Sequence, residues 1–102
     1  MSYWMIVGPE KQAWAHAMQR GWSDELTVVV SSAEEMRQTD PTQIEGVVWV
    51  QALQLGWDEA QRIAEELYVM HVTWPDIWIM APAPIMAALY DGVVPKLRPV
   101  AA

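Results

Sequence analysis

Short apolar segments recur along the chain and alternate with longer segments of helical periodicity. The apolar segments are Tyr3–Gly8, Leu26–Ser31, Gly46–Leu53 and Asp76–Ala81. Each is apolar at nearly every position rather than at every second one, which is the pattern of a strand covered on both faces. Strands that alternate with helices form parallel sheets. The sequence therefore predicts an α/β domain built on a mostly parallel sheet.

The segments between the strands predict four helices. They are expected at residues 10–20, in a short segment capped by Ser31 or Ser32, at Trp57–Met70 and at Pro84–Tyr90. Right-handed crossovers then give a small doubly wound sheet, flavodoxin-like, with strand order 2-1-3-4 and helices on both faces. Residues 93–102 are expected to form a fifth, edge strand or a tail, because Pro95 and Pro99 restrict strand pairing.

Composition limits the classes of function. A chain of 102 residues is expected to form a single domain, residues 1–102. Its hydrophobic share of 53% exceeds the usual ~45–50%, which predicts apolar surface and hence a protein partner or self-association. The net charge of −7 repels phosphate, so nucleic acid is not an expected partner. The absence of cysteine excludes disulfides, thiolate metal sites and cysteine nucleophiles.

The sequence also bears on location. Glu10 and Lys11 interrupt the first apolar segment, and no basic flank of the signal-peptide type precedes it. The longest uncharged stretch, Ile77–Tyr90, is too short to span ~30 Å of hydrocarbon and contains Pro82 and Pro84. We therefore expect a cytoplasmic protein without a membrane partner. Seven Trp, two Lys and no Phe or Asn are typical of a GC-rich coding sequence, which leads to the hypothesis of a bacterial or bacteriophage source.

Doubly wound sheets bind ligands beyond the carboxyl ends of their strands. The candidate ligand residues on this rim are Gly8, Glu10, Ser31, Ser32 and Gln51. Glu10 is the acid/base candidate there, and the two serines are candidate anion donors. The chain has no GxGxxG or GxxxxGK[ST] motif, and the serines fit equally well as helix caps. A small-molecule or phosphate-binding domain, enzymatic or not, is therefore the alternative hypothesis.

The predicted order of elements resembles that of response-regulator receiver domains. This resemblance implies acidic residues after the first strand, a phosphorylated Asp at the end of the third strand and a Lys late in the chain. Here the first strand ends in Val7-Gly8, the third ends near Gln51, and Lys96 does not end a core strand. The resemblance therefore covers the fold and not the phosphorylation chemistry.

The two histidines do not predict a metal site. His16 is expected on the solvated face of the first helix, and His71 near the end of the third. Neither has a His, Cys or acidic neighbour at the spacing of metal ligands. We therefore expect no metal and no cofactor.

The tryptophans fall into two groups. Those expected in strands or in the first helix, and hence in the core, are Trp4, Trp14, Trp49 and Trp78. Those expected at the ends of elements, where Trp is often part of an interface, are Trp22, Trp57 and Trp74. The alternative for the second group is that these side chains only cover the ends of the sheet.

The last helical segment is unusual because Ala81–Leu89 is apolar throughout. A helix that is apolar on all sides requires burial on all sides, yet a terminal helix has one sheet face to cover. Its other side must meet a partner, a second copy or the tail Val93–Val100. The contact residues expected there are Ile85, Met86, Leu89 and Tyr90. The leading hypothesis is therefore a non-enzymatic protein–protein interaction domain, with a homodimer as the simplest case.

Overall fold

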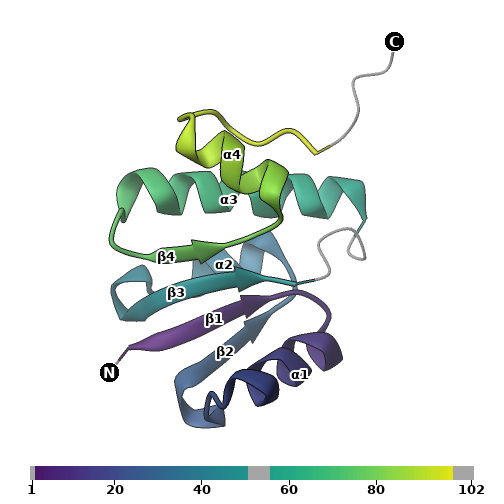
Figure 1. The fold of residues 1–102 in the computed structure, drawn as a ribbon, viewed down its shortest axis with the longest axis vertical. Coiled ribbons are helices and arrows are strands. Elements are labelled where there is room, and N and C mark those ends of the chain that lie inside the picture. Colours follow the sequence, from purple (N-terminus) through teal and green to yellow (C-terminus); the bar gives the residue numbers. More distant parts are fainter. Residues whose placement is uncertain (1, 51–55, 98–102) are drawn as a thin grey trace.

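A four-stranded, all-parallel sheet organises the molecule (Figure 1). The computed structural model describes residues 2–50 and 56–97. Its strands are β1 (Tyr3–Val7), β2 (Thr27–Val30), β3 (Ile44–Trp49) and β4 (Trp78–Met80). Their order is β2-β1-β3-β4, and every neighbouring pair is parallel. The predicted fold class and strand order are confirmed.

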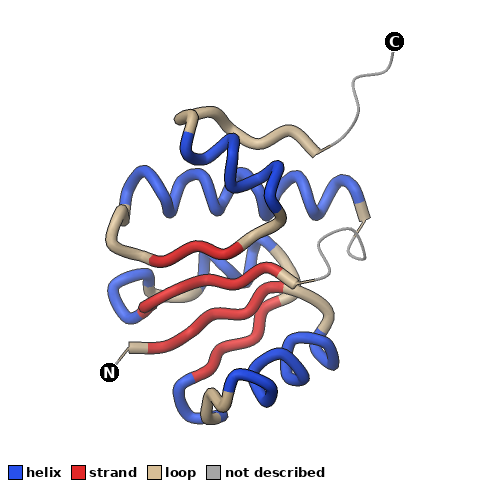
Figure 2. The backbone as a smooth tube through the Cα atoms, in the orientation of Figure 1, coloured by secondary structure: helices blue, strands red, loops and turns tan. Residues whose placement is uncertain are grey.

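Helices connect the strands in the predicted sequence (Figure 2). They are α1 (Glu10–Arg20), α2 (Ala33–Gln38), α3 (Trp57–Thr73) and α4 (Ala83–Tyr90), with short 3-10 turns η1 (Asp24–Leu26) and η2 (Pro41–Gln43). Helix α3 continues beyond the predicted Met70 and ends before Trp74-Pro75, because a residue that precedes proline avoids helical geometry.

Alternate side chains of β1 point into two separate cores. Met5 and Val7 belong to the larger core, which also contains buried residues of α2, α3 and α4. Ile6 belongs to the smaller core, which contains Ala13 and Ala17 of α1. The sheet is therefore covered by α1 on one face and by the other three helices on the opposite face, as a doubly wound fold requires.

Helix α1 covers one half of its face of the sheet. It packs against β1 and β2, and it lies beside β2 in Figure 1. The other half of that face is formed by β3 and by β4, which is an edge strand. Trp78 of β4 is 70% exposed as a result. The expectation that Trp78 belongs to the core is wrong, because edge position and incomplete helix cover leave its ring in solvent.

The last helix has one buried side and one exposed side despite its apolar composition. Ile85 and Leu89 are buried in the larger core. These two of the four expected contact residues of α4 therefore face inward. The outward positions carry Ala83, Ala87 and Tyr90, which are small or carry a hydroxyl. Helix α4 can therefore have one solvent-exposed face although almost all of its residues are apolar.

Residues 93–97 form a docked tail and not a strand. The Gln61 side chain of α3 donates to the carbonyl of Pro95 and accepts from the amide of Leu97, both at 2.9 Å. Pro95 itself is fully buried. The fifth strand is therefore not formed over residues 93–97, because Gln61 takes backbone groups that a ladder would need and proline has no N–H. The remainder of the predicted strand lies outside the described residues.

Candidate functional site

The serines at the carboxyl end of β2 are used in capping helix α2. Ser32 Oγ accepts a hydrogen bond from the amide of Glu35 at 3.1 Å. Ser31 Oγ donates to the Glu35 carboxylate at 3.2 Å. This is the helix-cap alternative for Ser31 and Ser32, and Ser32 occupies the N-cap position.

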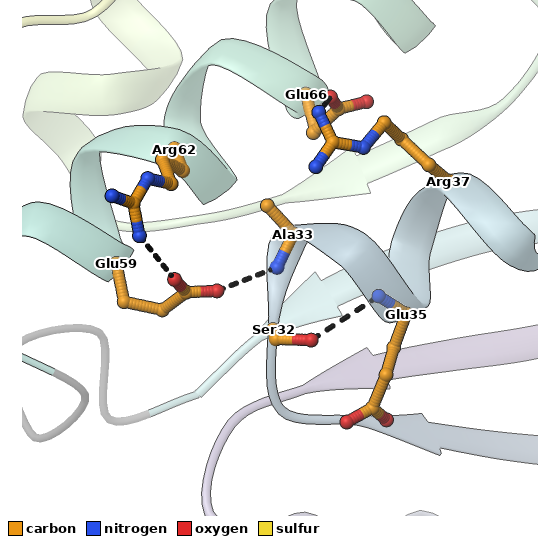
Figure 3. Close-up of polar contacts among 7 residues, drawn as sticks. All are labelled: Ser32, Ala33, Glu35, Arg37, Glu59, Arg62 and Glu66. Atoms are coloured by element: carbon orange, nitrogen blue, oxygen red, sulfur yellow. Dashed lines mark hydrogen bonds and ion pairs between the residues drawn. The ribbon is translucent and has the colours of Figure 1, made fainter.

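A carboxylate of the chain itself occupies the amino end of α2. Glu59 of α3 accepts a hydrogen bond from the buried amide of Ala33 at 2.7 Å, and Arg62 contacts its second oxygen at 3.3 Å (Figure 3). Exposed amides at a helix start attract anions, and here Glu59 is that anion. The Glu59 side chain is half-buried in this position.

The other candidate ligand residues of the rim are placed as follows. Gly8 has φ +154°, and a Cβ there would stand 2.6 Å from both Cγ2 and the carbonyl oxygen of Val50. The glycine is thus explained by the close approach of the chain that leaves β3. Glu10 is exposed in the first turn of α1, and Gln51 lies outside the described residues.

The rim is therefore acidic and largely occupied by its own contacts. Glu10, Glu35 and Glu59 all lie where an anionic ligand would approach the carboxyl ends of β1 and β2. A phosphate there would meet carboxylates and would have to displace Glu59 from Ala33. This geometry does not favour the alternative hypothesis of phosphate binding.

A second surface surrounds β4, and we name it the β4 surface. It is formed by His71, Trp74, Asp76, Trp78, Met86 and Tyr90. A groove of about 390 Å³ lies between β4 and α4, and a shallower one of about 690 Å³ lies between the start of β4 and the start of β3. The residues Pro75–Trp78 line both grooves, so the two form one continuous surface.

Three aromatic side chains of the β4 surface are accessible. Trp74 is 38% exposed, Trp78 70% and Tyr90 77%. The Tyr90 ring packs edge-to-face on His71, with ring centroids 6.4 Å apart. Half-buried Met86 lines the groove between β4 and α4. Large accessible aromatic groups beside a groove are the usual features of a binding surface.

The charge of the β4 surface is negative. Asp76 lines both grooves, and Glu45 lines the shallower one. Among the described residues that line the two grooves there is no Lys or Arg, and His71 is the single ionisable base.

The structure brings together part of the predicted interface. Met86 and Tyr90 line the groove beside α4, and Trp74 lines the second groove. Leu89 lines the groove beside α4 although it is almost fully buried, whereas Ile85 lies in the core and lines neither groove. Sequence reasoning missed Trp78. The predicted strand order contained the necessary signal, because β4 is last in that order and therefore has one free edge.

The two remaining candidate tryptophans lie elsewhere. Trp57 is 44% exposed at the start of α3, at the opposite end of that helix from Trp74. Trp22 stacks on Trp4, with ring centroids 4.5 Å apart and an interplanar angle of 12°. Trp22 thus covers the end of the smaller core, which is the alternative reading for a tryptophan at an element end.

The Trp22 ring also contacts His16, whose Nε2 is enclosed and has no hydrogen-bond partner within residues 2–50 and 56–97. Burial, followed by the positive charge of Arg20, lowers the pKa of His16 from its ordinary value. His16 is therefore not the fully solvated residue that the sequence pattern predicts.

The described part of the chain contains no group of three or more His, Asp or Glu that could hold a metal ion. None of its helices is both long enough and apolar enough to cross a membrane. Comparison with known proteins gives no relative: no family model, no curated protein and no solved structure matches the chain.

Proposed function

We propose that this protein is a non-enzymatic protein–protein interaction domain that binds its partner through the β4 surface. The observation that carries the proposal is the exposure of Trp74, Trp78 and Tyr90 around two connected grooves. Trp and Tyr supply much of the binding energy at protein interfaces, because each buries a large area while restricting few torsions.

The grooves have the features of a site for apolar side chains of a partner. Met86 lines the groove between β4 and α4, and its unbranched side chain can adapt to different shapes. Removing the exposed indole rings from water provides the driving force, at roughly 25 cal/mol per Å² of apolar area.

The elements beneath the β4 surface are anchored in the larger core. Ile85 and Leu89 hold α4 on the larger core, and Ile79 holds β4 there. Side chains on such elements lose less freedom on binding than side chains on loops, which favours affinity.

Self-association through the same surface is the homodimeric form of this proposal, since symmetric dimers are the commonest soluble oligomers. Ligand binding at the rim is less well supported, because Ser32 and Glu59 there already hold helix α2. On composition and charge we place the protein in the cytoplasm of a bacterium or a phage-infected host. There it would act as an accessory protein on another protein rather than on nucleic acid or a membrane.

The test is a selection of protein-fragment binders displayed on particles, using the wild-type protein as bait. Binders are then measured against the double variant Trp78→Ser, Tyr90→Ser and against Trp57→Ser. Trp57 is a matched control, because it is an exposed tryptophan remote from the β4 surface.

We expect the selected binders to lose at least about tenfold in affinity for the double variant and to retain affinity for the control. Binders that lose affinity only for Trp57→Ser, or for neither variant, contradict the proposal. Sedimentation velocity over a wide concentration range, with wild type and double variant, separately measures the homodimeric form.

A further inference from the structure

We propose that the β4 surface recognises an arginine side chain flanked by apolar residues in its protein partner. This inference rests on the function proposed above and specifies the chemistry of the partner. It follows from the charge of the two grooves, the aromatic groups beside them and the absence of described Lys and Arg residues from their lining.

The first observation is that the grooves are negatively charged. Asp76 lines both, Glu45 lines the shallower one, and no described Lys or Arg lines either. The chain as a whole carries a net charge of −7. A partner that brings a cation is therefore attracted locally by these carboxylates. The negative net charge of the whole chain also attracts it at longer range.

The second observation is that an acidic residue and aromatic residues line the same grooves. Asp76 and Trp78 both line the two grooves, and Tyr90 lines the one beside α4. Because Trp78 alternates with Ile79 of the larger core, its ring lies on the α1 face of the sheet, and Tyr90 is the aromatic residue on the α4 side. A guanidinium group can pair with a carboxylate through two parallel N–H groups while its plane stacks on an aromatic ring. An ammonium group offers a point charge and cannot make both contacts in the same way. The combination therefore favours Arg over Lys.

The third observation is that none of the Lys and Arg residues in the described ranges 2–50 and 56–97 lines the two grooves. Arg37 of α2 pairs with Glu66 of α3, and Arg62 pairs with Glu59 within α3. A two-fold symmetric contact repeats the same residues on both sides. Two copies joined at the β4 surface would place Asp76 and Glu45 against an equally acidic surface. A foreign, arginine-bearing partner is therefore favoured over a second copy.

The test uses four pooled peptide libraries with identical randomised apolar flanks. The central residue is Arg, Lys, citrulline or Glu, and citrulline keeps the shape of Arg without its charge. Binding to the full-length protein is measured by NMR at 50 and 300 mM NaCl, following the Trp78 indole and the Asp76 amide. The variants Asp76→Asn and Asp24→Asn are measured in parallel, since Asp24 is an exposed carboxylate of η1 that lies outside both β4 grooves.

We expect the Arg library to shift the Trp78 and Asp76 signals and to bind about tenfold more tightly than the citrulline library. The Lys library should lie between them, and the Glu library should bind least. Salt at 300 mM and the Asp76→Asn substitution should each remove most of the difference between Arg and citrulline, whereas Asp24→Asn should not.

Equal binding of the Arg and citrulline libraries at the β4 surface overturns the arginine inference and leaves the proposed function intact. A concentration-dependent dimer that is abolished by Trp78→Ser also overturns it, because the occupant is then a second copy. If no library shifts these signals while a displayed binder does, the partner chemistry is wrong. If neither does, the proposed function fails together with the inference.

Discussion

The ring of Trp4 on β1 lies across Gly46 on the neighbouring strand β3. The two residues are register partners in the sheet, and a Cβ on Gly46 would stand 2.8 Å from Cη2 of Trp4 and would collide with other atoms of the ring. Trp22 stacks on the same indole, so the ring has little freedom to move away. Glycine in this strand is therefore explained by the space that Trp4 occupies.

This relationship predicts the effect of Gly46→Ala. The added methyl group overpacks the site, and we expect a loss of about 1–3 kcal/mol in the free energy of unfolding, measured by urea denaturation. The variant Trp4→Leu, which has no ring over position 46, should tolerate Gly46→Ala better. A double-mutant cycle with no coupling between the two positions would contradict this packing.

Helix α4 offers a matched pair of substitutions on opposite faces. Leu89 is 2% exposed and its neighbour Tyr90 is 77% exposed. Leu89→Ala should lower the free energy of unfolding by about 2–5 kcal/mol, because it leaves a cavity in the larger core. Tyr90→Ala should change it by no more than about 0.5 kcal/mol. Thermal and urea denaturation of both variants measure the difference, and equal losses would mean that α4 does not pack as described.

The hydrogen bond between the Glu59 carboxylate and the start of α2 predicts that removal of the carboxylate lowers stability there. Glu59→Ala leaves the amide of Ala33 without its acceptor, and Ala33 is buried. We expect a loss of about 1–3 kcal/mol in the free energy of unfolding, together with faster hydrogen exchange at Ala33. The control is Glu65→Ala on the exposed side of the same helix, and it should leave the exchange rate at Ala33 unchanged.

His16 predicts a dependence of stability on pH. Its pKa in the folded protein is lowered by burial and by Arg20, so the unfolded chain binds the proton more readily than the folded one. Stability should therefore fall as the pH decreases through the unfolded value of ~6.5. Once the pH lies below the folded pKa, the contribution of His16 to stability is fully lost. His16→Gln should flatten the profile of unfolding free energy between pH 8 and 5, scanned at about half-unit steps. A profile of unchanged slope in the variant would assign the pH dependence to other groups.

Much of the fold could be predicted from local signals. The four apolar segments and the helical periodicities predicted the element order. Right-handed crossovers predicted a doubly wound sheet, and the flavodoxin-like strand order expected for it is the one observed. Strand lengths were less predictable. The fourth apolar segment was expected over Asp76–Ala81, but β4 pairs over Trp78–Met80 alone, because the turn at Trp74-Pro75 extends to Ile77.

The candidate site was predicted less completely. The sequence pointed to the last helix, and Met86 and Tyr90 do lie on the β4 surface. The sequence could not show which residues of the set Ile85, Met86, Leu89 and Tyr90 are buried, because all four are large and three of them are apolar. Hydropathy alone therefore does not distinguish the buried positions from the exposed ones. The direction of each side chain depends on how α4 is rotated against α3 and β4, which is a tertiary property.

Sequence by itself determined which segments are strands and helices, the parallel order of the sheet and the acidic character of the surface. These follow from local periodicity, turn residues and charge count, which need no knowledge of long-range contacts. Tertiary structure alone decided that Trp78 is exposed, that Glu59 occupies the amino end of α2 and that Gln61 holds the tail at Pro95. Each of these depends on residues far apart in the chain, whose approach is set by packing of the whole domain.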